Sequence, residues 1–108
     1  SPSKKKKIYN IYVTYKHSGS NSLGSFLSYS TNGGTSFATY DGDGSTQISN
    51  NTLDQATSWE IHKFTFTTPV ECQSMTLKFN GPTNVSTKID INDVSIEYRE
   101  LYGKVSAT

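Results

Sequence analysis

Residues 88–99 read Lys-Ile-Asp-Ile-Asn-Asp-Val-Ser-Ile-Glu-Tyr-Arg, and the apolar alternation along this stretch changes phase halfway. Apolar residues fall on odd numbers up to residue 91 and on even numbers from residue 94 onward. Successive side chains of a strand point to opposite faces, so a strand with one buried face must bulge where the phase changes. The stretch therefore predicts a final strand with a bulge at Asn92 and Asp93.

Composition restricts the chain to one small β-rich domain. Its 108 residues are enough to bury roughly 65% of the surface of the unfolded chain, and they leave no room for a second domain. Hydrophobic residues make up 32%, yet seven Tyr and five Phe raise the aromatic share to 12%. Aromatic residues among many Ser, Thr, Asn and Gly are typical of short strands joined by polar turns.

Cysteine content and hydropathy argue against a disulfide-stabilised fold and against a membrane-spanning helix. Cys72 is the only cysteine, so no intrachain disulfide forms, and its apolar surroundings predict a buried free thiol. No apolar run approaches the ~18 residues of a membrane-spanning helix, and no signal peptide opens the chain.

Strand signals recur along the chain, whereas helical periodicity is almost absent. The pattern predicts an all-β fold, an antiparallel jelly-roll β-sandwich of two packed sheets. We expect a flexible basic arm over residues 1–7, the sandwich over 8–100 and a C-terminal tail over 101–108. Residues 41–58 are expected to form the longest connection. The predicted strands are 8–17, 26–29, 37–40, 59–67, 70–79 and the final strand already described.

The strand expected over residues 59–67 has the same kind of phase change. Trp59 and Ile61 share one parity, whereas Phe64 and Phe66 share the other. Either a bulge near residues 62–63 or burial of both faces is needed to accommodate these four side chains. Trp59 is expected to lie in the core.

Four sequence features follow one another in a recognisable order. They are a Tyr-rich strand (8–15), the hairpin Ser-Tyr-Ser-Thr-Asn-Gly-Gly-Thr-Ser-Phe (28–37), a Trp followed by Phe-x-Phe (Trp59, Phe64, Phe66) and Ile-Asn-Asp-Val-Ser-Ile (91–96). Because these features occur in the same order there, the chain resembles the jelly-roll carbohydrate-binding modules and related galactose-binding-like domains. The resemblance spans about 90 residues. It departs from that pattern in two places, because Asn92 stands where the family usually has Asp and Phe37 where a Trp is frequent.

The resemblance implies glycan binding, either on a flat sheet face that carries aromatic rings or in loops at the edge of the sandwich. Rings suit this task because the CH groups of a sugar stack on them while polar groups bind its hydroxyls. Tyr12 is opposite in parity to the expected core residues of its strand, so its ring is expected to face solvent. Each tyrosine also has a plain structural interpretation, as a half-buried strand residue. The candidate rings are Tyr12, Tyr29, Tyr40 and Tyr102.

The resemblance also implies a structural calcium ion near the final strand. Asp93 matches the family's ligand position, with Asn92 beside it, and carboxylate and amide oxygens are ligands that calcium accepts. Asp41 and Asp43 offer a second candidate set, although Asp-Gly pairs are also ordinary turn formers.

Catalysis finds little support in the sequence. No nucleophile elbow surrounds a serine, no phosphate-binding glycine motif occurs, and the acidic residues are scattered, so we expect a protein that is not an enzyme. Four adjacent cations, Lys4, Lys5, Lys6 and Lys7, are expected to anchor the chain to an acidic partner. No basic stripe with interleaved aromatics follows them, which argues against specific nucleic-acid binding.

Two functions of different classes therefore remain. The first is a carbohydrate-binding adhesion module on a secreted, cell-surface or virion-surface assembly. The second is a structural capsid-decoration or fibre accessory protein, attached to a larger viral assembly through the lysine arm and its strand edges. Both place the protein outside the cell or on a virion surface. Because a small sandwich leaves strand edges open, a homo-oligomer is also compatible with the sequence.

Overall fold

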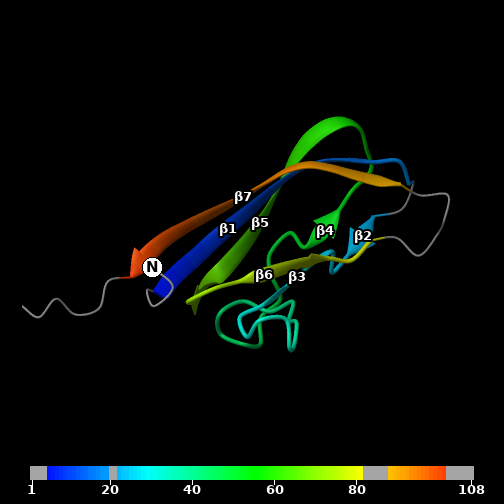
Figure 1. Cartoon of the computed structure of the whole chain (residues 1–108). Helices are drawn as coiled ribbons and strands as arrows, with labels where there is room; N and C mark the ends of the chain where they lie inside the picture. Colours follow the sequence, from blue (N-terminus) through cyan, green and yellow to red (C-terminus); the bar gives the residue numbers. More distant parts are fainter. Residues whose placement is uncertain (1–4, 20–21, 82–87, 102–108) are drawn as a thin grey trace, which may run out of the picture.

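The computed structural model describes residues 5–19, 22–81 and 88–101, and these residues form an all-β arrangement of antiparallel sheets (Figure 1). Within these ranges no helix is present that is long and apolar enough to cross a membrane. The strands are β1 (Lys5–His17), β2 (Leu23–Gly24), β3 (Leu27–Ser30), β4 (Thr52–Leu53), β5 (Ala56–Cys72), β6 (Thr76–Phe79) and β7 (Ile89–Leu101).

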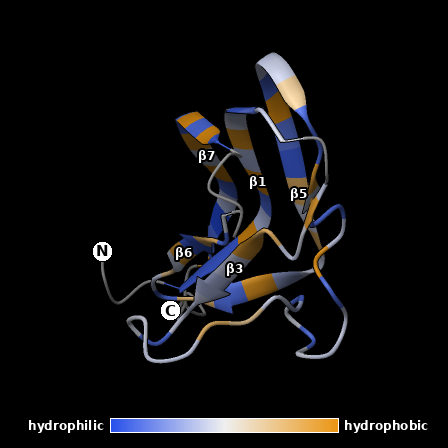
Figure 2. Cartoon of the chain, turned by 90° about the vertical axis from the view of Figure 1, so that its right-hand side faces the viewer, coloured by the Kyte–Doolittle hydropathy of each residue, from blue (hydrophilic) through white to orange (hydrophobic). Residues whose placement is uncertain are grey.

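The three long strands form one sheet, in which β1 lies between β5 and β7 and pairs antiparallel with both. Two smaller sheets, β2 with β4 and β3 with β6, lie on one side of it (Figures 1 and 2). One face of the long sheet is therefore covered, which we call the inner face. The opposite face, which we call the outer face, has no second layer among the described residues.

The core lies between the inner face and the smaller sheets. Ile11 and Val13 of β1 are fully buried. The ring of Phe26 stacks between those of Phe64 and Phe79, with centroid distances of 6.2 and 5.4 Å. Burial of each such side chain contributes about 1.5–3 kcal/mol. This packing fixes the two layers against each other.

A buried amide connects the two smaller sheets. The Asn51 side chain accepts a hydrogen bond from the backbone N–H of Leu27 at 2.7 Å and donates one to its carbonyl at 2.9 Å. The Asn51 side chain thus pairs with β3 as a neighbouring strand would, and it satisfies backbone groups that burial would otherwise leave without a partner.

The predicted bulge in the final strand is confirmed. Along β1 and β7 the pairing passes from Thr14 opposite Asp93 directly to Tyr15 opposite Ile91. Asn92 is therefore the extra residue. The bulge turns the apolar side chains on both sides of it toward the same face of the sheet.

The prediction of a bulge near residues 62–63 is wrong. The pairing of β1 with β5 runs without a break from Asn10 opposite Thr65 to Tyr15 opposite Glu60, and the irregularities lie outside this segment. Burial of both faces is also absent, because Ile61 is 71% exposed.

Trp59 is not a core residue, contrary to the expectation. Its side chain is 48% exposed. Trp59 shares the parity of Ile61, so both point to the outer face, whereas Phe64 and Phe66 point into the core. An apolar residue on this parity stays exposed because none of the described residues forms a second layer over that face.

Two other boundaries differ from the sequence-based expectation. The first strand begins at Lys5, so three of the four adjacent lysines lie in the sheet rather than in an arm. The expected hairpin over 28–40 is reduced to an isolated bridge between Tyr29 and Ala38, because β3 pairs instead with β6, far along the chain. The described strands do not by themselves establish jelly-roll connectivity, which stays a prediction.

Candidate binding face

The outer face of the three-stranded sheet gathers aromatic, polar and charged side chains on one surface. Antiparallel register and the alternation of side chains assign its members. The outer-face residues include Asn10, Tyr12, Thr14, Lys16, Trp59, Ile61, Lys63, Thr65, Asp93, Ser95, Glu97 and Arg99.

A hydrogen-bonded carboxylate lies in this face where β1 meets β7. Asn10 pairs with Glu97 in the register, and the Asn10 side-chain amide donates to Glu97 Oε1 at 2.7 Å. The Tyr12 hydroxyl donates to the same oxygen at 3.1 Å. These two hydrogen bonds, first that of Asn10 and then that of Tyr12, hold the pKa of Glu97 below its ordinary value. The same contact raises the pKa of the Tyr12 hydroxyl. Glu97 is therefore an ionised hydrogen-bond acceptor.

Two aromatic rings lie on the same face. Tyr12 is opposite Lys63 on β5, whose Nζ lies 5.9 Å from the Tyr12 ring centroid. Trp59 lies four residues before Lys63 on β5, about 13 Å along the strand at its ordinary rise. The Nζ of Lys16 lies 4.8 Å from the Trp59 ring centroid. Cation–π contacts of this kind restrict how each ring is oriented.

Two other predicted rings, Tyr29 and Tyr40, do not join this surface. Tyr29 is only 8% exposed and packs edge-on against Phe66 with centroids 5.4 Å apart. Tyr40 is 41% exposed but lies on the connection between β3 and β4. Tyr102 lies outside the described residues. Of the three predicted rings within the described residues, Tyr12 alone is on the outer face, and its partner there is Trp59, which the sequence assigned to the core.

Several members of the face were missed by sequence reasoning. Glu97, Asn10 and Lys63 come from three different strands, and only the register brings them together. Trp59 carried a usable signal, because its parity is opposite to that of the buried Phe64.

The predicted calcium ligands lie at the bulge of β7, and both are exposed. Asp93 Oδ2 accepts a hydrogen bond from the Ser95 hydroxyl at 3.3 Å. Asn92 is the bulged residue beside it. Among the described residues no three His, Cys, Asp or Glu side chains come together, whereas calcium takes about six to eight oxygens. Asn92 and Asp93 therefore do not assemble a calcium site by themselves, and calcium stays a prediction drawn from the resemblance alone.

The predicted lysine anchor is divided by the sheet. Lys5, Lys6 and Lys7 belong to β1, whereas Lys4 lies outside the described residues. The Lys6 ammonium donates to the Gln73 carbonyl at 3.1 Å, so it is engaged within the protein. The described lysines thus do not form a separate cationic arm.

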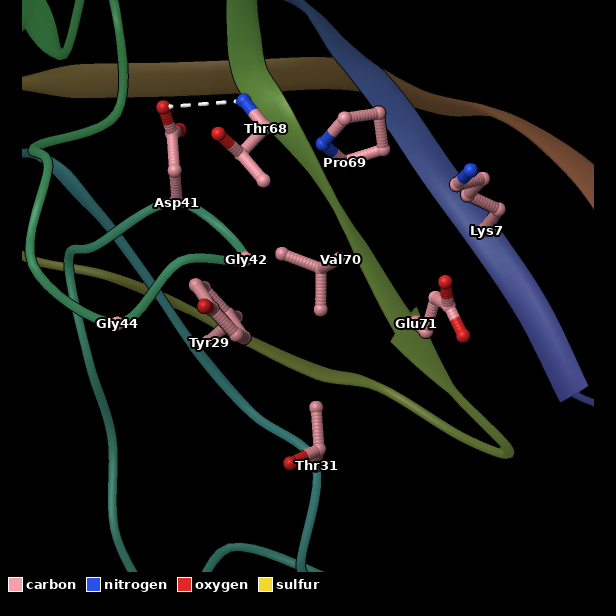
Figure 3. A pocket seen from close by; sticks show the side chains of 10 residues that line it. All are labelled: Lys7, Tyr29, Thr31, Asp41, Gly42, Gly44, Thr68, Pro69, Val70 and Glu71. Carbon is pink, nitrogen blue, oxygen red and sulfur yellow. Dashed lines mark hydrogen bonds between the residues drawn. The ribbon is translucent and has the colours of Figure 1, made fainter.

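A groove of about 480 Å³ lies beside residues 68–71 of β5 (Figure 3). Asp41 lies at one end of it and Lys7 and Glu71 at the other. Asp41 is 1% exposed, and its Oδ2 accepts from the Thr68 N–H at 3.3 Å. Burial raises the pKa of Asp41, and its Oδ1 has no hydrogen-bond partner among the described residues. Tyr29 also lines this groove.

Comparison with protein-family models, with curated proteins and with solved structures finds no match to this chain.

Proposed function

We propose that the protein is a non-catalytic carbohydrate-binding module whose outer face takes the glycan. The observation that carries the proposal is the pair of rings, Trp59 and Tyr12, on one uncovered sheet face beside hydrogen-bonding groups. A jelly-roll sandwich, a role in adhesion and a place on a cell or virion surface belong to the same proposal.

The chemistry of the face suits a sugar. Exposed rings offer flat apolar surface for the CH groups of a pyranose, which stack there with loss of little conformational entropy. The ionised Glu97 accepts hydrogen bonds from sugar hydroxyls, and Lys63 donates them. About 13 Å along the strand separates the two rings, so an oligosaccharide rather than a single sugar spans both.

The lowered pKa of Glu97 suits a hydrogen-bond acceptor better than a general acid. A glycosidase needs one carboxylic acid whose pKa is raised so that it can protonate the leaving oxygen. The hydrogen bonds to Glu97 lower its pKa and keep it ionised instead. Glu97 is therefore suited to holding hydroxyl groups, not to donating a proton.

A glycan-array screen followed by calorimetry with the best ligand tests this function. Trp59→Ala is expected to weaken binding by about tenfold, the effect of losing one stacking contact of ~1.4 kcal/mol. Phe37→Ala is the matched control, because Phe37 is an exposed ring (38%) on the connection between β3 and β4. Circular dichroism of both variants checks that each remains folded.

Two results would reject the outer face as the site. One is a wild-type protein that binds no glycan at high micromolar concentration. The other is binding that Trp59→Ala leaves unchanged while Phe37→Ala abolishes it.

The alternative function is structural, as a capsid-decoration or fibre accessory protein. Its support is the long edge of β7, which pairs with no strand in the described part of the chain and so offers backbone groups to a neighbouring subunit. Wild-type protein that binds no glycan but binds an assembled virion would favour this alternative.

A further inference from the structure

The two edges of the three-stranded sheet are unequal. The edge of β5 is covered, since Ser49 and Thr65 exchange backbone hydrogen bonds at 2.9 and 3.2 Å and Gly42 donates to the Thr68 carbonyl at 2.8 Å. The edge of β7 pairs with no strand among the described residues, although β7 runs for 13 residues. A long open edge is a template for pairing with another strand.

The direction of the free backbone groups on β7 follows from the pairing of β5. Thr65 directs its N–H and carbonyl away from β1 and toward Ser49, so its partner Asn10 directs its own groups toward β7. Asn10 is opposite Glu97, so the backbone N–H and carbonyl of Glu97 point toward β1. Backbone groups alternate in direction along a strand, so the N–H and carbonyl of Ile96 point away from β1, toward the open edge of the sheet. Those of residues 94 and 98 point the same way.

The same even-numbered residues carry apolar side chains that the inner layer leaves partly uncovered. Ile96 is 37% exposed and Tyr98 50% exposed, although both are on the inner face, opposite Ile11 and Ile8 respectively. A groove of about 330 Å³ borders them, with Met75 on its wall. Free backbone groups and uncovered apolar side chains thus coincide on one edge.

We propose that β7 pairs antiparallel with β7 of a second copy of this chain, with the two-fold axis at Ile96. This register places Ile96 against Ile96 of the other copy, and Val94 against Tyr98, on the inner face. On the outer face it places Asp93 against Arg99, twice by symmetry. Apolar residues are thereby matched on the inner face and opposite charges at the two Asp93–Arg99 pairs, whereas Ser95 lies opposite Glu97.

Neighbouring registers are less favourable. A two-fold axis at Ser95 sets Asp93 opposite Glu97, which opposes two carboxylates. An axis at Glu97 sets that carboxylate opposite its own copy, and an axis at Tyr98 sets Ile96 opposite Glu100. Like charges directly opposite each other destabilise a strand pair, as does a charge against an apolar side chain.

Sedimentation velocity over a concentration series is the first test. The wild type is expected to form a dimer, and Ile96→Lys is expected to weaken dimerisation by about a hundredfold, because two apolar contacts are replaced by opposed ammonium groups. Ile61→Lys is the matched control, since Ile61 is 71% exposed on β5 and outside the interface. A wild type that stays monomeric at millimolar concentration overturns the proposal, as does a dimer that Ile96→Lys leaves intact.

Charge exchange and cross-linking test the register. Arg99→Asp is expected to weaken the dimer by about tenfold, and adding Asp93→Arg to restore it. In a Cys72→Ala background, Ile96→Cys is expected to form an intermolecular disulfide, because paired Cα atoms lie about 5.5 Å apart. Tyr98→Cys is expected not to cross-link, since its copies lie about 13 Å apart in this register. Cross-linking through residue 98 but not 96 would refute the proposed register.

Discussion

At the scale of single residues, Asp43 shows how one carboxylate organises a turn. Its Oδ1 accepts hydrogen bonds from the backbone N–H groups of Ser45 and Thr46 at 2.9 and 2.8 Å, and its Oδ2 accepts from the Thr46 hydroxyl at 2.7 Å. These contacts, first that of the Ser45 N–H, lower the pKa of Asp43 from 3.8 to about 2. The Asp43 carboxylate thus stabilises the turn of its own Asp-Gly-Asp-Gly loop.

The depressed pKa of Asp43 predicts a defined pH dependence of stability. A group that is more acidic when folded contributes its stability above the unfolded pKa of 3.8 and loses it as the pH falls toward about 2. Asp43→Asn is therefore expected to be less stable than the wild type at pH 6, and the difference is expected to shrink between pH 4 and pH 2. Urea unfolding followed by circular dichroism at each pH measures it.

Asp90→Asn is the control for this titration, because Asp90 is an exposed carboxylate on β7. A gap between wild type and Asp43→Asn that stays constant from pH 6 to pH 2 would contradict the proposed role of the Asp43 charge.

At the scale of elements, the loop that holds Asp43 is packed tightly against Thr68 and Pro69 of β5. Gly42 donates its N–H to the Thr68 carbonyl at 2.8 Å. A Cβ atom at Gly42 would clash with the Pro69 carbonyl oxygen and would lie 3.1 Å from that of Thr68. Since the obstructing atoms belong to the backbone, they cannot move aside as a flexible side chain would.

Gly42→Ala is therefore expected to destabilise the protein by about 2 kcal/mol, the usual cost of forcing extra volume into a packed site. Gly24→Ala is the matched control, because no atom lies within 4 Å of the Cβ it would add. Chemical denaturation of the two variants measures the difference. Equal stabilities would mean that the loop is not held against β5 in solution.

The elements differ in how well the sequence predicts them, for physical reasons. The bulge at Asn92 was predictable because the phase change lies within one strand with apolar residues on both sides of it. The exposure of Trp59 was not predicted, because its parity, opposite to that of the buried Phe64, was attributed to a bulge or to burial of both faces. The pairing of β3 with β6 depends on packing between distant segments, which local turn signals do not reveal.

The candidate binding face was predictable only in part. Tyr12 could be assigned to the outer face from the parity of its own strand. Glu97 could not, because its role depends on the register that brings it to Asn10 across two strands. A site that spans neighbouring strands becomes visible only once the sheet order is known.

At the scale of the whole molecule, the long sheet dominates the shape, which extends 58 × 24 × 22 Å. Because the outer face contains both proposed sugar-stacking rings and β7 is an edge of the same sheet, the two proposals are geometrically compatible. Pairing through β7 would continue each outer face into that of the second copy, with the order β5-β1-β7-β7-β1-β5. One dimer would then present two glycan sites on a continuous six-stranded surface.

This arrangement predicts that dimerisation changes avidity but not the affinity of one site. A surface coated densely with glycan binds both sites of a dimer, so the second contact forms at high effective concentration. Ile96→Lys is therefore expected to bind such a surface about a hundredfold more weakly than the wild type, and to bind the free oligosaccharide equally well. Surface plasmon resonance and calorimetry provide the two measurements, with Ile61→Lys as the charge-matched control only for self-association, since Ile61 lies on the glycan face. If Ile96→Lys lost surface binding and free-ligand binding equally, the substitution would have damaged the glycan site itself. If a monomeric variant bound the surface as well as the wild type does, the two sites of a dimer would not act together.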